Sequence, residues 1–367
     1  MSAAVPERRT SPVELLWDLV FAFAVTQVIT LLLGDPTWRG FGRSMLALAL
    51  VWWAWSAFVW VANAFDYEER ALRLVLLVAM GFVFIVGLAL PRAFGDRATL
   101  FASTYAIVRL LHLALYAEAS RRGNASWSAI VGFAVTVVIG MALLIVGSFF
   151  AAGARTVLWV AAAAIDYAGP AWLTRERLRG LQRVAVAHFA ERYSLFVIIC
   201  LGESIVAIGV QASERLTAHV LVVLSLCVVG TVGLWWSYFD ELATAAEGRL
   251  RGHHDPVLAA ADAYSYIHLL IVAGIIIFAV GAKLAIEGSR GPASLALVGG
   301  VALYLAGQSG FSWRMLGSPD RSRGAAALAL AAVCPFAGGI AAWVAAAVAA
   351  AMLVVVCSLT AVRESPD

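Results

Sequence analysis

Residues 188–209 read HFAERYSLFVIICLGESIVAIG, a run that is long and apolar enough to cross a membrane. The rest of the chain has the same character, because 62% of its 367 residues are hydrophobic, 13% are charged, and the mean hydropathy is +0.89. A soluble globular protein carries about 25% charged residues. The composition therefore predicts an all-α, polytopic membrane protein and excludes soluble, disordered and disulfide-rich secreted classes.

Runs of similar length and hydropathy recur along the chain and predict about twelve membrane spans. Their approximate limits are 13–33, 43–64, 72–91, 98–119, 127–150, 155–173, 187–211, 216–239, 260–285, 293–313, 324–340 and 342–362. The last two runs are almost continuous, but Pro335 with Gly338 and Gly339 predicts a tight hairpin between them. We therefore expect a transmembrane helix bundle with short loops.

The basic residues of the predicted loops indicate the orientation of the bundle. They are twice as numerous on the side of the N-terminus, and the loop TRERLRGLQR at 174–183 is the most basic. The positive-inside rule therefore predicts cytoplasmic N- and C-termini in the cell (cytoplasmic) membrane. The N-terminal residues lack a separate apolar signal segment, so we expect them to be mature sequence.

Several kinds of partner are not expected. The net charge of +3 is too small to indicate nucleic acid, and the four cysteines lack disulfide or metal-ligand spacing. His188 and Glu191 have a spacing found in metal-binding bundles, but without a second such pair no metal site is predicted. No motif identifies a cofactor, an ATP site or an oligomeric state. The bilayer and an unidentified small solute or ion are the partners that this composition predicts.

Three pairs of segments resemble each other in the same order and at similar offsets. VELLWDLVFAFAVTQVI (13–29) resembles AERYSLFVIICLGESIV (190–206), WVANAFD (60–66) resembles LWWSYFD (234–240), and LLVAMGFVFIVG (76–87) resembles LLIVAGIIIFAVG (269–281). Duplication of a six-helix unit would explain the order of these matches, and chance likeness between apolar helices is the alternative. Two parallel repeats of this kind are one known transporter architecture.

The duplication predicts a division of the chain into two halves. The expected parts are a cytoplasmic tail at 1–12, a first six-helix half at 13–173, a basic cytoplasmic linker at 174–186, a second half at 187–362 and a C-terminal tail at 363–367.

Charged residues at membrane depth are the candidates for a functional site, because a charge near the bilayer centre costs about 2.5–3.5 kcal/mol on insertion scales. Within 188–209, helical spacing places His188, Arg192 and Glu203 near one face and Glu191 off it. Glu203 lies roughly 16 Å deeper than Arg192 and is the best single candidate. The alternative is a structural carboxylate paired with an arginine of a neighbouring helix.

The first span opens with a helix cap. In Ser11-Pro12-Val13-Glu14, Ser11 stands at the N-cap position and Glu14 at the third helical position, which is a capping box. Capping alone would explain Glu14. Asp18 lies one turn further on nearly the same face, where no capping role reaches it, so we expect it to be functional or to form a buried ion pair.

Two further candidates lie in the fourth and sixth spans. Arg109 lies in the middle of YAIVRLLHLAL (105–115), and a lone arginine at that depth should be paired inside the bundle. Asp166 in the sixth span is a second inward carboxylate. Acids outnumber arginines among all these inward candidates, so a shared cavity would favour protons or other cations.

The ninth span and two helix ends supply the remaining candidates. In DAYSYIHLLIVAG (262–274), Asp262 and His268 lie on different faces, and His268 could titrate near neutral pH or be a hydrogen-bonded packing residue. Asp66 and Asp240 end their spans at the inner surface, and only their repetition in both halves distinguishes them from ordinary boundary residues.

The two long motifs at 13–29 and 188–209 resemble the low temperature requirement A (LtrA) family of bacterial integral membrane proteins. FDYEE after the second span, YAIVR in the fourth and WWSYFD at the end of the eighth add to the resemblance, which covers about residues 10–360. The resemblance implies many membrane spans and assigns no activity or ligand. The residues that lie in the matching motifs, and to which the resemblance assigns no role, are Glu14, Asp18, Asp66, Arg109, Glu191, Arg192, Glu203 and Asp240.

These observations favour a secondary transporter or channel-like permease, with Glu203, Arg109, Asp166 and Asp18 sharing an acidic intramembrane site. Glu203 would accept a proton or cation, and Arg109 would be its counter-charge. One alternative is a membrane enzyme acting on a lipid or isoprenoid, with carboxylates as general acid and base and the tryptophans of the second and eighth spans lining its pocket. Another is a sensor or assembly factor for membranes in the cold. The sequence favours a non-enzymatic function.

Overall fold

The computed structural model describes residues 10–65, 70–173, 175–179, 181–182, 184–213, 216–240 and 242–364, and all regular structure within them is helical. The long helices are α1 (Pro12–Gly34), α2 (Trp38–Ala62), α3 (Arg70–Ala89), α4 (Ala98–Arg121), α5 (Trp127–Ser148), α6 (Ala152–Ala168), α8 (Val186–Ser213), α9 (Ala218–Phe239), α12 (His268–Ile286), α13 (Gly291–Leu316), α14 (Arg321–Val333) and α15 (Ala342–Glu364). The short helices are α7 (Arg175–Leu178), α10 (Leu242–Arg251) and α11 (Pro256–Ala260), with 3-10 turns at Leu90–Arg92 and Cys334–Gly339 and π turns at Gly169–Leu173 and Ala261–Ile267.

Each predicted span coincides with a helix, and eleven helical stretches of described residues are long and apolar enough to cross a membrane. The sixth predicted span differs: α6 has 17 residues, so it measures roughly 25 Å against a hydrocarbon core of about 30 Å. The π turn Gly169–Leu173 continues it. The turn Cys334–Gly339 separates α14 from α15, where Pro335 predicts a hairpin. The chain is therefore a multi-pass helical membrane protein.

The helices expose apolar side chains as well as burying them. Leu19 is 58% exposed, Val135 55% and Val157 68%, while Trp17 and Phe21 on the other side of α1 are buried. Lipid tails solvate such outward faces. The backbone N–H and C=O groups need no water, because they form hydrogen bonds with each other within each helix.

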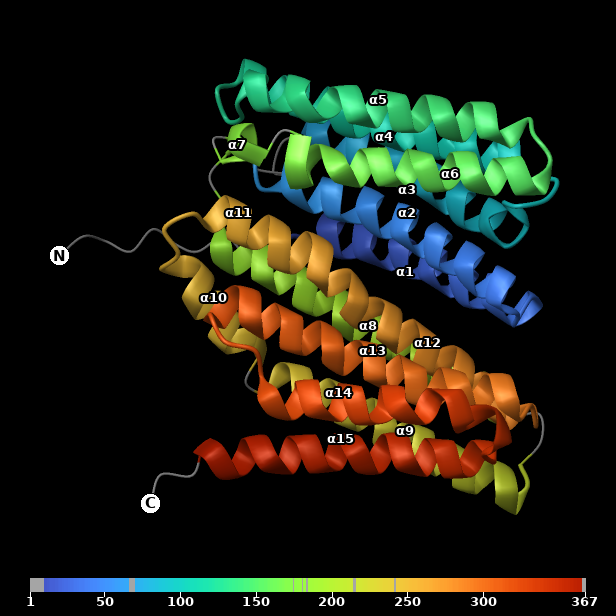
Figure 1. The fold of residues 1–367 in the computed structure, drawn as a ribbon. Coiled ribbons are helices and arrows are strands. Elements are labelled where there is room, and N and C mark those ends of the chain that lie inside the picture. The colour runs from blue at the N-terminus through green and yellow to red at the C-terminus, as the bar shows by residue number, and fades with distance from the viewer. Residues whose placement is uncertain are drawn as a thin grey trace. The chain divides into compact units, whose positions relative to one another are not determined.

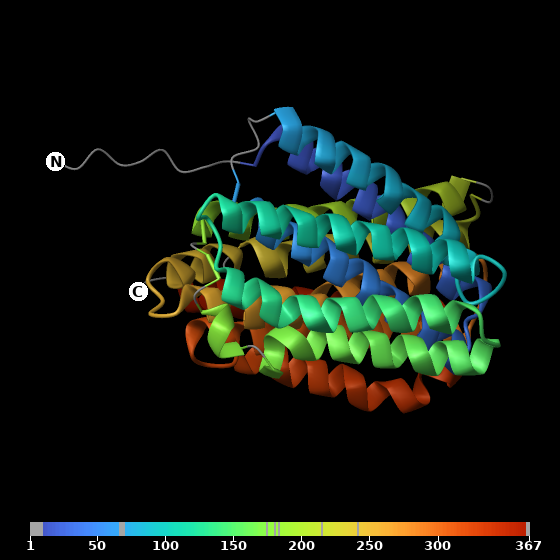
Figure 2. The ribbon, with the colours of Figure 1, turned by 90° about the horizontal axis from the view of Figure 1, so that it is seen from above.

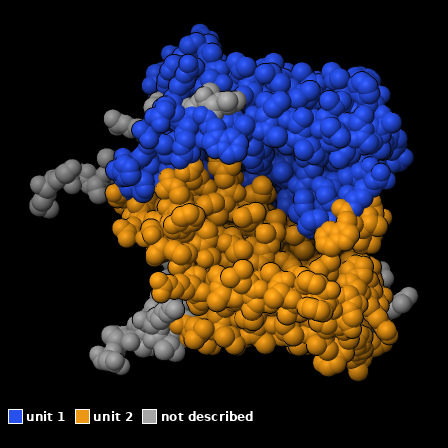
Figure 3. Space-filling model, viewed as in Figure 1, with its two compact units in different colours: residues 1–31, 39–196, 253–261 blue, residues 32–38, 197–252, 262–367 orange. Residues whose placement is uncertain are grey.

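The described residues form two compact units, which Figure 3 colours separately. Unit 1 comprises those of 1–31, 39–196 and 253–261, and unit 2 those of 32–38, 197–252 and 262–367. Helix α8 begins in unit 1 and ends in unit 2. These compact units differ from the two six-helix halves expected from duplication, which stay a prediction.

Unit 1 contains a row of four helices and an aromatic core. Helices α3, α4, α5 and α6 pack in chain order, each antiparallel to the next (Figures 1 and 2). The ring of Trp55 on α2 lies 4.2 Å from that of Phe196 on α8, and Trp17 on α1 lies 4.2 Å from Phe58 on α2. These aromatic contacts join α2 to α1 and to the first part of α8.

Unit 2 is built around α12 and α13, which approach each other backbone to backbone. A Cβ atom at Gly300 would lie 2.6 Å from the amide nitrogen of Phe278 and 2.9 Å from the carbonyl oxygen of Gly274. Glycine at such positions allows two helices in a membrane to approach closely. Helices α14 and α15 pack on α13, and α9 packs on α15.

We predict that Gly300→Ala destabilises the protein by about 1–3 kcal/mol, because the added methyl group would overlap backbone atoms that cannot rotate away. Gly299→Ala is the matched control, since its Cβ would meet only the Cys334 Sγ at 3.8 Å. Thermal unfolding in detergent measures both. Equal unfolding temperatures for the two variants would contradict the close packing of α12 on α13.

Candidate functional site

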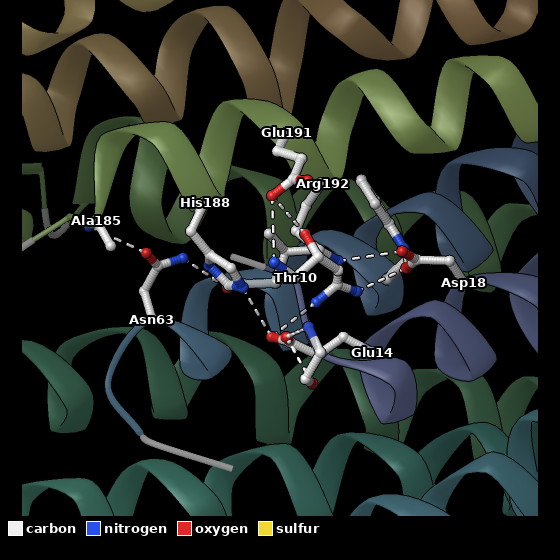
Figure 4. Close-up of polar contacts among 11 residues, drawn as sticks. Thr10, Glu14, Asp18, Asn63, Ala185, His188, Glu191 and Arg192 are labelled. Carbon is white, nitrogen blue, oxygen red and sulfur yellow. Dashed lines mark hydrogen bonds and ion pairs between the residues drawn. The ribbon is translucent and has the colours of Figure 1, made fainter. Parts of the chain in front are cut away.

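Four buried ionisable side chains meet where α1 lies beside the first part of α8, within unit 1 (Figure 4). Glu14 and Asp18 are four residues apart on α1, and His188 and Arg192 are four residues apart on α8, so each pair shares one face of its helix. None of the four is more than 1% exposed. We call these residues the α1–α8 cluster.

Arg192 lies between the two carboxylates. Its Nη2 donates to Oδ1 of Asp18 at 2.6 Å and its Nε to Oδ2 at 3.1 Å, which gives two-point binding of this carboxylate. The Arg192 Nη1 lies 3.2 Å from Oε1 of Glu14, and the His188 Nε2 lies 3.0 Å from the same oxygen. One oxygen of Glu14 therefore faces both basic residues of α8.

The other oxygen of Glu14 caps its own helix. Oε2 accepts hydrogen bonds from the amide and the hydroxyl of Ser11, both at 2.8 Å. The capping and ion-pair roles thus belong to different oxygens of one carboxylate. Because the cap holds the Glu14 side chain at the first turn, Oε1 is presented to α8.

Helix α2 completes the surroundings of Asp18. The indole Nε1 of Trp55 donates to the Asp18 Oδ1 at 2.8 Å, and the hydroxyls of Ser56 and Tyr193 form a hydrogen bond of 2.7 Å. Sequence reasoning missed Trp55 as a partner. The available signal was that a buried indole N–H requires an acceptor.

Glu191 lies outside the cluster. It is exposed, and its Oε2 accepts from the amide of Thr10 at 3.2 Å and from the Thr10 hydroxyl at 2.9 Å. Glu191 and Arg192 are consecutive in α8, and the rotation of 100° per residue places the first on an exposed face and the second on a buried face.

A second buried ion pair in unit 1 joins α4 to α6. The Arg109 Nη2 lies 2.9 Å from Oδ1 and 3.0 Å from Oδ2 of Asp166, and the two residues are 2% and 6% exposed. His112, one turn after Arg109, packs edge-on against Tyr116. Arg109 therefore has a carboxylate partner within its own unit.

Unit 2 places Asp262 and His268 in separate surroundings. Asp262 pairs with Arg314 of α13 at 2.8 Å, at a partly exposed position. His268 is fully buried, with its Nε2 3.1 Å from the Tyr238 hydroxyl and its ring stacked on Tyr264. Sequence reasoning missed Arg314 as a partner because it counted this arginine among the loop charges.

The remaining sequence candidates do not belong to the α1–α8 cluster. Glu203 is partly buried in the part of α8 that belongs to unit 2, and Asp240 is exposed just after α9. Asp66 lies outside the described residues. A site shared by Glu203 with Asp18, Arg109 and Asp166 would combine residues of both units, and it stays a prediction.

The α1–α8 cluster has chemistry suited to holding a proton. Neutral His188 protonated on Nε2 can donate to Glu14, and its buried Nδ1 has no hydrogen-bond partner among the described residues. In that state two carboxylates face one guanidinium, so these four side chains carry one negative charge in excess. Among the described residues, no group of three His, Cys, Asp or Glu side chains has the arrangement of a metal site.

We predict that Arg192→Gln lowers the free energy of unfolding by about 3–5 kcal/mol, because it leaves buried carboxylates without their guanidinium. The double variant Asp18→Asn/Arg192→Gln should lose less than the sum of the single losses, since it removes both charges. Arg179→Gln is the control, because the Arg179 side chain is 55% exposed and its ion pairs are worth about 0–1 kcal/mol. Denaturant titration in mixed micelles measures each value, and additive losses would contradict the pairing.

Comparison with known proteins agrees with this helical membrane fold. The family model described as bacterial low temperature requirement A protein matches residues 9–358. The chain is also similar to an uncharacterized protein of Rhizobium meliloti (strain 1021), with 34% identity over 305 residues that cover 80% of this chain and 75% of the relative. The matched family region includes all four residues of the α1–α8 cluster and the pair Arg109–Asp166. The chain therefore belongs to the bacterial LtrA family.

Proposed function

We propose that this LtrA-family protein is a proton-coupled secondary transporter, and that the α1–α8 cluster is its proton site. The observation that carries the proposal is the burial of Glu14, Asp18, His188 and Arg192 in one hydrogen-bonded cluster within the first turns of two candidate membrane-spanning helices. Ionisable residues in such places commonly mark proton and ion pathways.

The charge balance of the cluster supports proton binding. Two carboxylates and one guanidinium give these four side chains a formal charge of −1 when His188 is neutral. An excess charge in a medium of low dielectric constant is unfavourable, so uptake of one proton by the cluster as a whole would be favoured. Because the groups are within hydrogen-bonding distance, the proton belongs to the cluster rather than to one residue.

Proton uptake would alter the contact between α1 and α8. A protonated Asp18 no longer attracts the guanidinium of Arg192 as an ion does, so the two-point contact at 2.6 and 3.1 Å weakens. Breaking a buried ion pair is worth about 3–5 kcal/mol, and each 1.4 kcal/mol changes an equilibrium tenfold. One proton could thus shift the population of two arrangements of these helices, which alternating access requires.

Glu203 extends the proposed path along α8. It lies roughly 16 Å beyond Arg192 on the same helix, in an apolar segment. We propose it as a second acidic position for the proton or a coupled cation, and the transported solute is an unidentified small molecule or ion.

The rival hypothesis of a lipid-modifying enzyme has less support. Its pocket was expected to be lined by tryptophans, but the rings of Trp52 and Trp55 lie 5.0 Å apart and pack against Phe196 of α8. Asp18 accepts hydrogen bonds from Arg192 and Trp55, an arrangement that holds its carboxylate away from a substrate.

We predict that infrared difference spectra between pH 8 and pH 5 contain a band from proton uptake by the α1–α8 cluster. Asp18→Asn and His188→Gln should each remove or shift this band, because either change alters the hydrogen-bonded cluster that receives the proton. Glu176→Gln is the control, since the Glu176 side chain is 78% exposed outside the predicted spans. Spectra that both cluster variants leave unchanged would refute the assignment.

A flux assay tests transport itself. In liposomes under an imposed pH gradient, with membrane potential clamped and a trapped pH dye, Asp18→Asn and Glu203→Gln should each slow proton entry at least about tenfold, or about 1.4 kcal/mol. Glu176→Gln should match the unmodified protein. Full flux in Glu203→Gln would remove Glu203 from the path, and full flux in both variants would exclude the proposed proton route.

A further inference from the structure

A pocket of about 420 Å³ lies in unit 2, and its lining residues include none of the α1–α8 cluster. It lies at the end of α13, the loop Gly317–Asp320 and the start of α14, and its polar lining includes Ser312, Ser318, Asp320, Arg321 and Arg323. Its volume falls within the range of about 300–1,000 Å³ typical of small-molecule sites.

The two arginines in this pocket differ in their surroundings. Arg323 is 3% exposed; its Nη1 binds Asp320 at 2.9 Å and its Nη2 donates to the carbonyl of Ser237 at 3.0 Å. Its buried Nε has no hydrogen-bond partner among the described residues. Arg321 is exposed, and no described residue forms an ion pair with it. The pocket lining therefore includes one exposed guanidinium, that of Arg321, with no ion-pair partner among the described residues, and one buried guanidinium, that of Arg323.

Asp320 is the carboxylate of this pocket, and its oxygens are already occupied. Oδ1 accepts from the amides of Ser322 and Arg323 at 2.9 and 3.0 Å and from the Ser322 hydroxyl at 2.5 Å, while Oδ2 accepts from Arg323. Burial alone would raise the pKa of Asp320, but these hydrogen bonds outweigh it and hold the pKa below its ordinary value. With Asp320 ionised, the side chains that line the pocket carry one positive charge in excess.

The first amides of α14 are not available to a ligand, because Asp320 caps them. Recognition must therefore come from the guanidinium groups, whose planar N–H donors match the oxygens of phosphate. A pocket whose lining has excess positive charge, an exposed guanidinium and hydroxyl side chains suits an oxyanion. Arg314 at the same end of α13 is already paired with Asp262, so the excess charge rests on Arg321 and Arg323.

We propose that this pocket binds a phosphate group, either as an anionic lipid headgroup or as a free phosphate ion. Arg321 contributes the exposed guanidinium, and Arg323 contributes a second positive charge in the lining. The positive-inside rule places this loop on the cytoplasmic side, where basic pockets between helices bind anionic headgroups. The proposal is independent of the proton site in unit 1.

Calorimetry on the full-length protein in detergent tests the site. The probes are dioctanoyl phosphatidylglycerol, inorganic phosphate, and dioctanoylglycerol, which has the same chains without phosphate. The variants are Arg321→Gln, Ser318→Trp to fill the pocket without changing charge, and Arg249→Gln as control, because Arg249 is an exposed arginine of α10 that does not line the pocket. Thermal unfolding checks that each variant is folded.

We expect saturable binding of a phosphate-bearing probe, with one probe molecule bound per protein chain, and no binding of dioctanoylglycerol. Arg321→Gln and Ser318→Trp should each weaken binding at least about tenfold, and Arg249→Gln should leave it unchanged. Binding of phosphatidylglycerol alone would identify the ligand as a lipid headgroup, and binding of inorganic phosphate as well would show that the free ion suffices. Absence of binding by both phosphate probes, equal weakening in Arg249→Gln, or unchanged binding in Arg321→Gln would overturn the proposal.

Discussion

A charge within a bilayer needs a partner inside the protein, and unit 1 meets this constraint through the contact of α1 with the start of α8. Arg192 binds Asp18 at two points and lies near Glu14, while His188 lies against the same Glu14 oxygen. A shift of α1 along α8 by one turn, about 5.4 Å, would leave one of the two carboxylates without a basic partner on α8, because each pair of residues is itself one turn apart. The ion pairs therefore set the register of these two helices, and Trp55 adds α2 to the same arrangement.

The direction of the pairing carries topological information. Glu14 meets His188 and Asp18 meets Arg192, so the contacts advance along both helices together and α1 runs parallel to the start of α8. Both helices consequently enter the membrane from the same side. Duplication of a six-helix unit requires this orientation, although the duplication itself stays a prediction. A parallel pair whose contact depends on charge is also a place where one proton can change helix packing, which is the basis of the proposed transport mechanism.

The sequence predicted positions better than partners. Long apolar runs located the spans because hydropathy is a local property, and the turn at Cys334–Gly339 followed from Pro335 and two glycines. The capping box identified one role of Glu14 because Ser11 is its near neighbour in the chain. Partners distant in sequence were missed: Trp55 was considered only among the tryptophans that would line the pocket of an enzyme, and Arg314 was grouped with loop charges although it binds Asp262.

From the sequence alone, the membrane class, the helix positions and the faces that carry Glu14, Asp18, His188 and Arg192 could be determined, because composition and the 3.6-residue period act within each helix. The tertiary structure decided which faces meet. It joined Asp18 to Arg192 and Arg109 to Asp166, and it left Arg321 beside a pocket on unit 2. The pattern of residues within one helix does not determine which partner a buried charge has, because any residue of opposite charge could neutralise it. Only the packing of whole helices brings one such partner within hydrogen-bonding distance.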